Sequence, residues 1–277
     1  PKALTVHIQQ RDLKTAESRL KAMKRLGMEK LEIAENHLLK KSPNIFSTPE
    51  KLQNDVWGSL WYLPDVKFFQ PKTNINCFIW LPTALNLFGP IRSVVYFDIF
   101  VNMVKMALTP IGYFAELAEL DFSLQARSGG LQLKLGGFDD KMVEFCDTIC
   151  KEISRECKCV PLEEDAEKHR KYYDIVIETL QRKYLNSTRE PQRQATALRL
   201  HLILGYRIHP REAAASLQSN QYQEYLFFVK SMMNTVSIDM LVHGNMPVSN
   251  ALKMREVVNL MIPSGAVPAA PKFRSTF

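Results

Sequence analysis

The sequence lacks an uninterrupted apolar run long enough to cross a bilayer. Its longest apolar stretch, residues 91–108, is broken by Arg92, Asp98, Asn102 and Lys105. A spanning helix needs about 20 predominantly apolar residues, so we interpret this stretch as a core helix. No secretory apolar segment opens the chain. We therefore expect a soluble globular protein with no membrane partner.

Cysteines are few, and their number is odd. The five are Cys77, Cys146, Cys150, Cys157 and Cys159. This pattern fits reduced thiols in a cytoplasmic, reducing compartment better than a disulfide framework. A zinc site built from Cys157 and Cys159 with the earlier pair is disfavoured, because their one-residue gap is shorter than the spacing in structural zinc sites.

Nucleic-acid motifs are also missing, although the chain carries a net charge of +7. Its 36 basic residues are interleaved with 29 acidic ones, which is typical of solvated helix faces. No helix-turn-helix or zinc-finger spacing is present. Nucleic-acid binding remains a disfavoured alternative, and it would require steeply salt-dependent affinity.

Other motifs that could carry chemistry have simpler interpretations. Gly129-Gly130 and Gly136-Gly137 are followed by no Lys-Ser or Lys-Thr, so we predict turns rather than phosphate loops. Asp139 and Asp140 precede an expected helix, and one of them is predicted to cap it rather than act as an acid or base. His243 ends a predicted strand, where a hydrogen-bonded role is favoured over metal ligation. We therefore assign no catalytic, cofactor-binding or metal-binding residue.

The chain divides into three parts. Apolar residues recur mostly every three or four positions from Leu13 to Leu39, and Pro43 and Pro49 follow, so residues 1–55 are predicted to be a helical lead-in and linker. They can also be the end of a preceding domain, since Pro1 in place of methionine suggests a longer polypeptide. Residues 56–262 are predicted to form an α+β domain. Residues 263–277, rich in proline and small side chains, are predicted to be an interdomain connector.

Within residues 56–262, alternation of apolar and polar residues predicts strands, and apolar residues three or four positions apart predict helices. The expected strands are 55–62 paired with 73–81, then 121–127 paired with 131–135, and finally 237–242. The expected helices are 91–108, 109–120, one starting after Asp140, 161–185, 192–204, 211–218, 221–235 and one capped by Ser249 that ends near residue 260. This order is typical of a mostly antiparallel sheet with helices packed on one face.

Seven aromatic residues gather in and between the first two predicted strands. They are Trp57, Trp61, Tyr62, Phe68, Phe69, Phe78 and Trp80. They could line a peptide-binding wall, but aromatic residues at strand spacing usually belong to a core. We therefore predict a core position for them.

Five segments within residues 56–260 resemble the third domain of the insulin-degrading-enzyme and pitrilysin family of zinc metallopeptidases. They are Leu60-Trp61-Tyr62-Leu63-Pro64-Asp65, Lys67-Phe68-Phe69-Gln70-Pro71-Lys72, Tyr113-Phe114-Ala115-Glu116-Leu117-Ala118-Glu119-Leu120, Lys134-Leu135-Gly136-Gly137-Phe138-Asp139-Asp140-Lys141 and Leu241-Val242-His243-Gly244-Asn245. They occur in the family's order and spacing.

The resemblance implies a peptidase of four α+β domains that form two bowls around a chamber. It places the catalytic zinc in the first domain, on an H-x-x-E-H motif. The six histidines here, His7, His37, His169, His201, His209 and His243, contain no pair at that spacing.

The expected function is thus a non-catalytic chamber wall of a zinc metalloendopeptidase that degrades peptides, inactive as a fragment. Its partners would be the remaining domains and the peptide substrates. The alternative is a catalytically dead homologue that acts as a scaffold or binding subunit.

Overall fold

The computed structural model describes residues 48–65, 70–127, 129–158, 163–187, 189–204 and 208–269. Its strands are β1 (Glu50–Asp55), β2 (Gly58–Pro64), β3 (Lys72–Trp80), β4 (Asp121–Arg127), β5 (Gly130–Phe138), β6 (Thr235–Gly244) and β7 (Val267–Pro268). Its α-helices are α3 (Pro90–Leu117), α4 (Met142–Lys158), α5 (Glu163–Ser187), α6 (Pro191–Leu204), α7 (Pro210–Gln218), α8 (Tyr222–Met232) and α9 (Val248–Asn259), and η2 (Ala84–Asn86) is a short 3₁₀ helix.

The strands form one seven-stranded sheet in the order β1-β2-β6-β3-β5-β4, with β7 added beside β6. Neighbours are antiparallel except at β2/β6 and β6/β7, which are parallel. The predicted β4–β5 pair is confirmed. The predicted pairing of β2 with β3 is wrong, because β6 lies between them. Alternation identifies a strand, but it does not identify the strand's partner.

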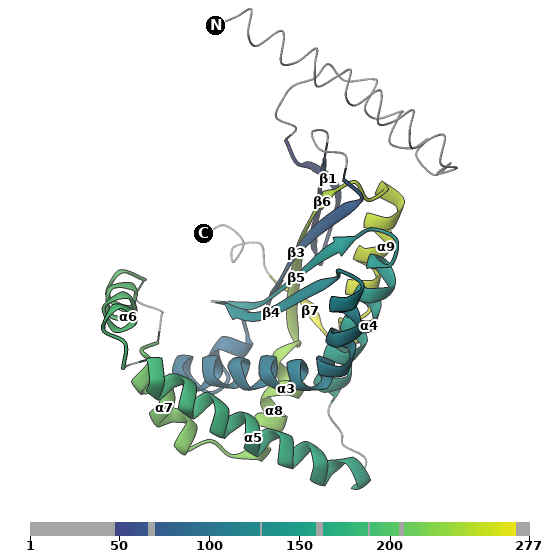
Figure 1. Ribbon diagram of the computed structural model, residues 1–277. Helices are drawn as coiled ribbons and strands as arrows, with labels where there is room; N and C mark the ends of the chain where they lie inside the picture. The colour runs from purple at the N-terminus through teal and green to yellow at the C-terminus, as the bar shows by residue number, and fades with distance from the viewer. Residues whose placement is uncertain are drawn as a thin grey trace, which may run out of the picture.

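Helices cover one face of this sheet, which confirms the predicted α+β architecture. Along β3, Ile75, Cys77 and Ile79 are buried while Asn74 and Asn76 are exposed. The same alternation in β5 and β6 places a continuous apolar layer on one side. Figure 1 shows α4 and α9 beside that side and α3 crossing below the strands. The other side of the sheet is not covered by these helices, and we call it the open face.

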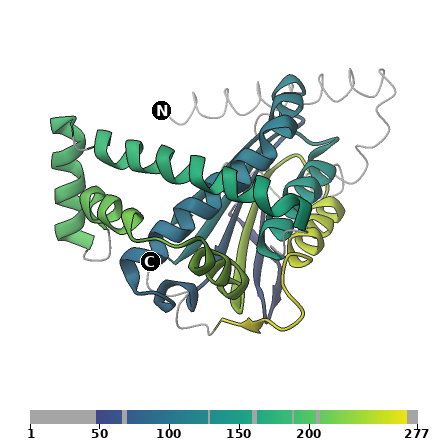
Figure 2. The same ribbon diagram turned by 90° about the horizontal axis from the view of Figure 1, so that it is seen from below.

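One long helix, α3, replaces the two helices predicted for residues 91–120. Pro110 lies inside it rather than at a helix start. An interior proline removes a ladder hydrogen bond and crowds the carbonyl four residues earlier. Buried side chains on both sides of Pro110, Leu108 and Ala115, nevertheless hold the helix in the core. By length and composition α3 could cross a membrane. Its packing against β4, α4, α5 and α7 is that of a core helix, and Figure 2 shows α5 crossing it.

Several predicted boundaries also shift. Helix α8 ends at Met232, and α9 follows Pro247 with no side-chain cap from Ser249. Strand β5 continues through Gly136 and Gly137, so the turn predicted there is wrong. β1 lies inside residues 1–55 and β7 inside residues 263–277. The helical lead-in predicted from residue 13 to 39 lies outside the described residues, and the three-part division stays a prediction.

A half-buried acid, Asp98, joins α3 to α5. Tyr184 donates a hydrogen bond of 2.5 Å to Asp98 Oδ2. Burial raises the pKa of Asp98 above its ordinary value of 3.8, and the hydrogen bond from Tyr184 offsets this only in part. A raised carboxyl pKa favours folding most below the unfolded-state pKa, and this contribution is lost as the pH rises through the folded-state pKa. As the pH rises above the unfolded-state pKa, the Asp98 carboxyl therefore stabilises the fold less.

Replacing Asp98 by asparagine is expected to raise the melting temperature at pH 7 by a few degrees, because the amide keeps an acceptor for Tyr184 without a buried charge. The difference from the original chain should shrink as the pH falls toward 4. Thermal unfolding followed by circular dichroism measures both effects. Glu116→Gln, at an exposed position on α3, is the control and should change little. A lower melting temperature for Asp98→Asn at pH 7 would show that the charged hydrogen bond outweighs desolvation.

Candidate functional site

The open face of the sheet is polar and aromatic, and a shallow pocket lies at its centre. In register across the strands, Asp239 on β6 lies between Ser59 on β2 and Phe78 on β3, and Phe78 lies opposite Gln132 on β5. The pocket has a volume of about 210 Å³. Its lining comprises Trp61, Asn76, Phe78, Gln132, Asp239, Met240 and Leu241. Four strands far apart in the sequence thus build one site.

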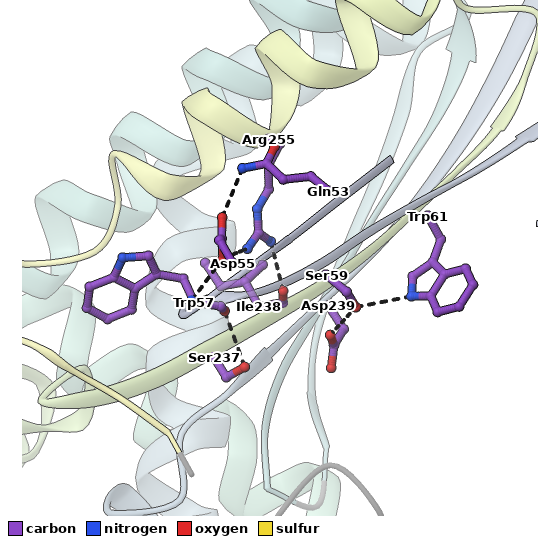
Figure 3. Close-up of polar contacts among 9 residues, drawn as sticks. All are labelled: Gln53, Asp55, Trp57, Ser59, Trp61, Ser237, Ile238, Asp239 and Arg255. Carbon is purple, nitrogen blue, oxygen red and sulfur yellow. Dashed lines mark hydrogen bonds and ion pairs between the residues drawn. The ribbon is translucent and has the colours of Figure 1, made fainter. Parts of the chain in front are cut away.

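Neutral donors hold the carboxylate of Asp239. The Ser59 hydroxyl donates to Oδ1 over 2.6 Å, and the Trp80 indole donates to Oδ2 over 3.0 Å. The Trp61 indole in turn donates to the Ser59 oxygen over 3.1 Å, as Figure 3 shows. Asp239 is half-buried. The two hydrogen bonds fix the orientation of the carboxylate. Among the described residues Asp239 forms no ion pair, so no neighbouring cation neutralises its charge.

Aromatic rings form one wall of the pocket. Phe78 and Trp80 lie 4.2 Å apart between ring centroids. Lys51 Nζ lies 4.7 Å from the centre of the Trp61 ring, within the range of a cation–π contact. Trp61 is 36% exposed. The Trp61 ring therefore binds the ammonium group of Lys51 through one of its faces.

These rings correct the prediction of an aromatic core. Trp57 and Tyr62 do pack against the core, but Trp61, Phe78 and Trp80 lie on the open face. Phe68 and Phe69 lie outside the described residues. Strand alternation assigns residues to two faces, and it does not indicate which face the helices cover.

Side-chain amides form the opposite side of the pocket. Gln132 donates through Nε2 to Asn76 Oδ1 over 2.9 Å, and Arg127 donates through Nε to Gln132 Oε1 over 3.1 Å. Amide groups both donate and accept hydrogen bonds, as peptide groups do. Together with the rings and the carboxylate, they suit contact with an extended polypeptide more than they suit chemistry on it.

A buried arginine anchors β6 directly beneath this site. Arg255 on α9 is completely buried. Its Nη1 donates to the Ile238 carbonyl over 2.7 Å, and its Nη2 lies 3.3 Å from Asp55 Oδ1. That carboxylate also accepts from the Trp57 backbone N–H, and Figure 3 shows the whole network. Ile238 immediately precedes Asp239, so the anchor fixes the strand that carries the pocket's carboxylate.

Sequence reasoning missed Arg255, although one signal was present. Position 255 lies on the same helical face as Ala251 and Val258, which are buried. A basic residue within an apolar helical stripe is a candidate for a buried ion pair.

The described histidines are scattered. His243 is exposed at the end of β6, and the hydrogen bond predicted for it is not formed with any described residue. His169 lies between Tyr222 Oη, 2.7 Å from Nδ1, and Glu156 Oε1, 3.1 Å from Nε2, which links α4, α5 and α8. His201 and His209 have ring centroids 6.5 Å apart. His7 and His37 lie outside the described residues.

Cys77, Cys146 and Cys150 pack in the core. The sulfur atoms of Cys146 and Cys150 are 3.8 Å apart on one face of α4. Burial raises the pKa of Cys77 to about 12, and the contact with Cys146, followed by burial, raises the pKa of Cys150. Thiols with raised pKa values are poor nucleophiles and metal ligands. Cys157 is half-buried, and Cys159 lies outside the described residues.

Asp139, one of the two residues predicted to cap the helix that follows, has a different hydrogen-bond partner. Its carboxylate accepts a hydrogen bond from the Thr73 hydroxyl, which ties the end of β5 to β3 instead of capping α4. Burial raises the pKa of Asp139. Asp140 is exposed. In the part of the chain that the structure describes, no three His, Cys, Asp or Glu side chains gather to hold a metal ion.

The fold defines a class: an α+β domain with a sheet that the described helices cover on one face, while polar and aromatic side chains lie on the other. The sequence model described as the middle or third domain of peptidase M16 matches residues 28–216. This chain therefore belongs to the peptidase M16 family and covers its middle region.

Individual relatives agree with this assignment. Insulin-degrading enzyme-like 2 of Arabidopsis thaliana is 26% identical over 240 residues, which are 86% of this chain and 23% of that protein. Human nardilysin is 28% identical over 212 residues, which are 76% of this chain and 17% of that protein. The chain thus spans about a fifth of the length of these relatives. The crystal structure of pitrilysin shares the fold, with a TM-score of 0.61 and 19% identity over 82% of this chain and 23% of that chain.

Proposed function

We propose that this chain forms a non-catalytic wall of the chamber of a zinc metalloendopeptidase that degrades peptides. The observation that carries the proposal is the match of residues 28–216 to the middle domain of peptidase M16. The H-x-x-E-H motif on which family members hold zinc does not occur in this sequence. The metal and the water chemistry would then lie on another domain of the parent protein.

The open face supports the proposal. A sheet surface that carries rings, amides and a carboxylate without covering helices is suited to face a cavity that peptides enter. The other face is fully used by the core, since it packs against α4 and α9. The open face is therefore the surface that this domain would turn toward the chamber. Its partners would be the remaining domains of the parent and the peptides within it.

The chain alone is expected to show no peptide hydrolysis, because it lacks the zinc motif. A fluorogenic peptide assay with added zinc, run with and without a chelator, measures this. In the same assay, addition of a separately expressed segment from the parent that carries H-x-x-E-H should give chelator-sensitive cleavage that increases with the concentration of this chain. Chelator-sensitive turnover by this chain alone would overturn the proposal. A parent without H-x-x-E-H would instead identify a scaffold or binding subunit.

A further inference from the structure

We propose that the open-face pocket binds the cationic side chain of a lysine or arginine in an extended peptide. The inference rests on the proposed function in one respect only, namely that peptides reach this face. It adds a binding site and the chemical class of side chain that the site selects.

The charge of Asp239 is the first reason. The Asp239 carboxylate accepts hydrogen bonds from Ser59 and Trp80, and neither of these neutral donors brings a positive charge to it. Each carboxylate oxygen can accept a second hydrogen bond. Since Asp239 lines the pocket and is half-buried, a cation there would interact with it more strongly than in open solvent.

The rings are the second reason. Trp61 and Phe78 line the same pocket as Asp239, and an ammonium or guanidinium group is attracted to the faces of such rings. Lys51 shows this attraction inside the molecule, since its Nζ lies over the Trp61 ring. A bound peptide cation would share or displace this contact.

The surrounding charges limit what can bind. Lys51 on β1 and Lys134 on β5 belong to the row of residues that crosses Trp61, Leu241 and Asn76. Both are exposed and positive, as is Arg127, which donates to Gln132 in the pocket lining. A single basic residue flanked by neutral or acidic residues therefore fits the site better than a run of basic residues, which these lysines would repel.

The three tryptophans of the chain, Trp57, Trp61 and Trp80, provide a direct test. Their indole N–H signals in ¹H–¹⁵N NMR spectra can be assigned with single Trp→Phe variants. Neutral-capped pentapeptides with lysine, norleucine or glutamate between alanines are titrated into the 277-residue chain. The lysine peptide should shift the Trp61 and Trp80 signals and leave Trp57 unchanged, with an affinity about fivefold or more above that of the norleucine peptide.

Variants separate the charge from the pocket shape. Asp239→Asn keeps the shape and one of the two acceptor oxygens, and it should weaken the lysine peptide about fivefold or more while leaving the norleucine peptide unchanged. Lys51→Met removes the internal competitor and should tighten the lysine peptide. Glu116→Gln, an exposed carboxylate on α3, is the matched control and should change neither affinity. If Asp239→Asn does not fold, Phe78→Leu tests the ring contact, with the position of the Trp57 signal reporting folding.

Two outcomes would overturn the inference. Equal binding of the norleucine peptide would define an apolar pocket only, and absence of shifts at Trp61 and Trp80 with every peptide would show that the pocket takes no side chain. Neither result would affect the complementation assay, so failure of the subsite is distinguishable from failure of the chamber-wall function.

Discussion

Replacing Arg255 by alanine is expected to lower the free energy of unfolding by about 3–5 kcal/mol, because it removes one partner of a buried charged network. The substitution leaves the Ile238 carbonyl without its 2.7 Å donor and opens a cavity between α9 and the sheet. It also frees Asp55, which orients the turn before β2 through the Trp57 N–H. Urea denaturation followed by circular dichroism measures the loss.

Two further variants test whether the loss of stability arises because Arg255 is buried. Arg193→Ala breaks the exposed pair with Glu190, whose side chains are 69% and 57% exposed, and it should change stability by less than about 1 kcal/mol. Arg255→Met keeps apolar volume without a charge, so it should be milder than the alanine variant. If Arg255→Ala proved as mild as Arg193→Ala, the buried bridge would not hold α9 to β6.

Much of the fold could be predicted from the sequence, because local periodicity records which residues form strands and helices. The alternation in residues 73–81 and 131–135 reflects burial on one face only, and the structure confirms these strands. Strand order is a different matter. β6 enters the sheet between β2 and β3 although about 150 residues separate it from β3, and no local pattern encodes such a pairing.

The candidate site was harder to predict for the same reason. Trp61, Phe78 and Asp239 are each ordinary strand residues in the sequence, and only the register of β2, β6 and β3 brings them together. The aromatic positions were identified, but their face was not. Asp239 attracted no prediction because a single carboxylate within an apolar strand becomes informative only when its neighbours are known.

Alanine substitutions at three glycines should separate the cost of backbone strain from the cost of a steric clash. Gly58→Ala is expected to lower the stability most. Gly58 has a φ of +140°, and an added Cβ would lie 1.9 Å from the Ile238 carbonyl oxygen. Backbone atoms cannot yield as a flexible side chain does, so β2 would have to move away from β6. We expect a loss of at least about 4 kcal/mol, seen as a large fall in melting temperature or as failure to recover folded protein.

The other two glycines show how much of the loss comes from backbone strain rather than from the steric clash. Gly89 has a φ of +82° and a ψ of 163°, a backbone region that is almost exclusive to glycine, with nothing within 4 Å of an added Cβ. Gly89→Ala therefore carries strain alone and should cost about 1–3 kcal/mol. Gly265 has an equally open surrounding and no positive φ, so Gly265→Ala should be nearly neutral. The order Gly265, Gly89, Gly58 in increasing damage follows from these contacts. Equal losses for Gly58→Ala and Gly89→Ala would mean that β2 can yield to the added methyl group, and that the close β2–β6 approach beneath the Asp239 pocket does not depend on glycine.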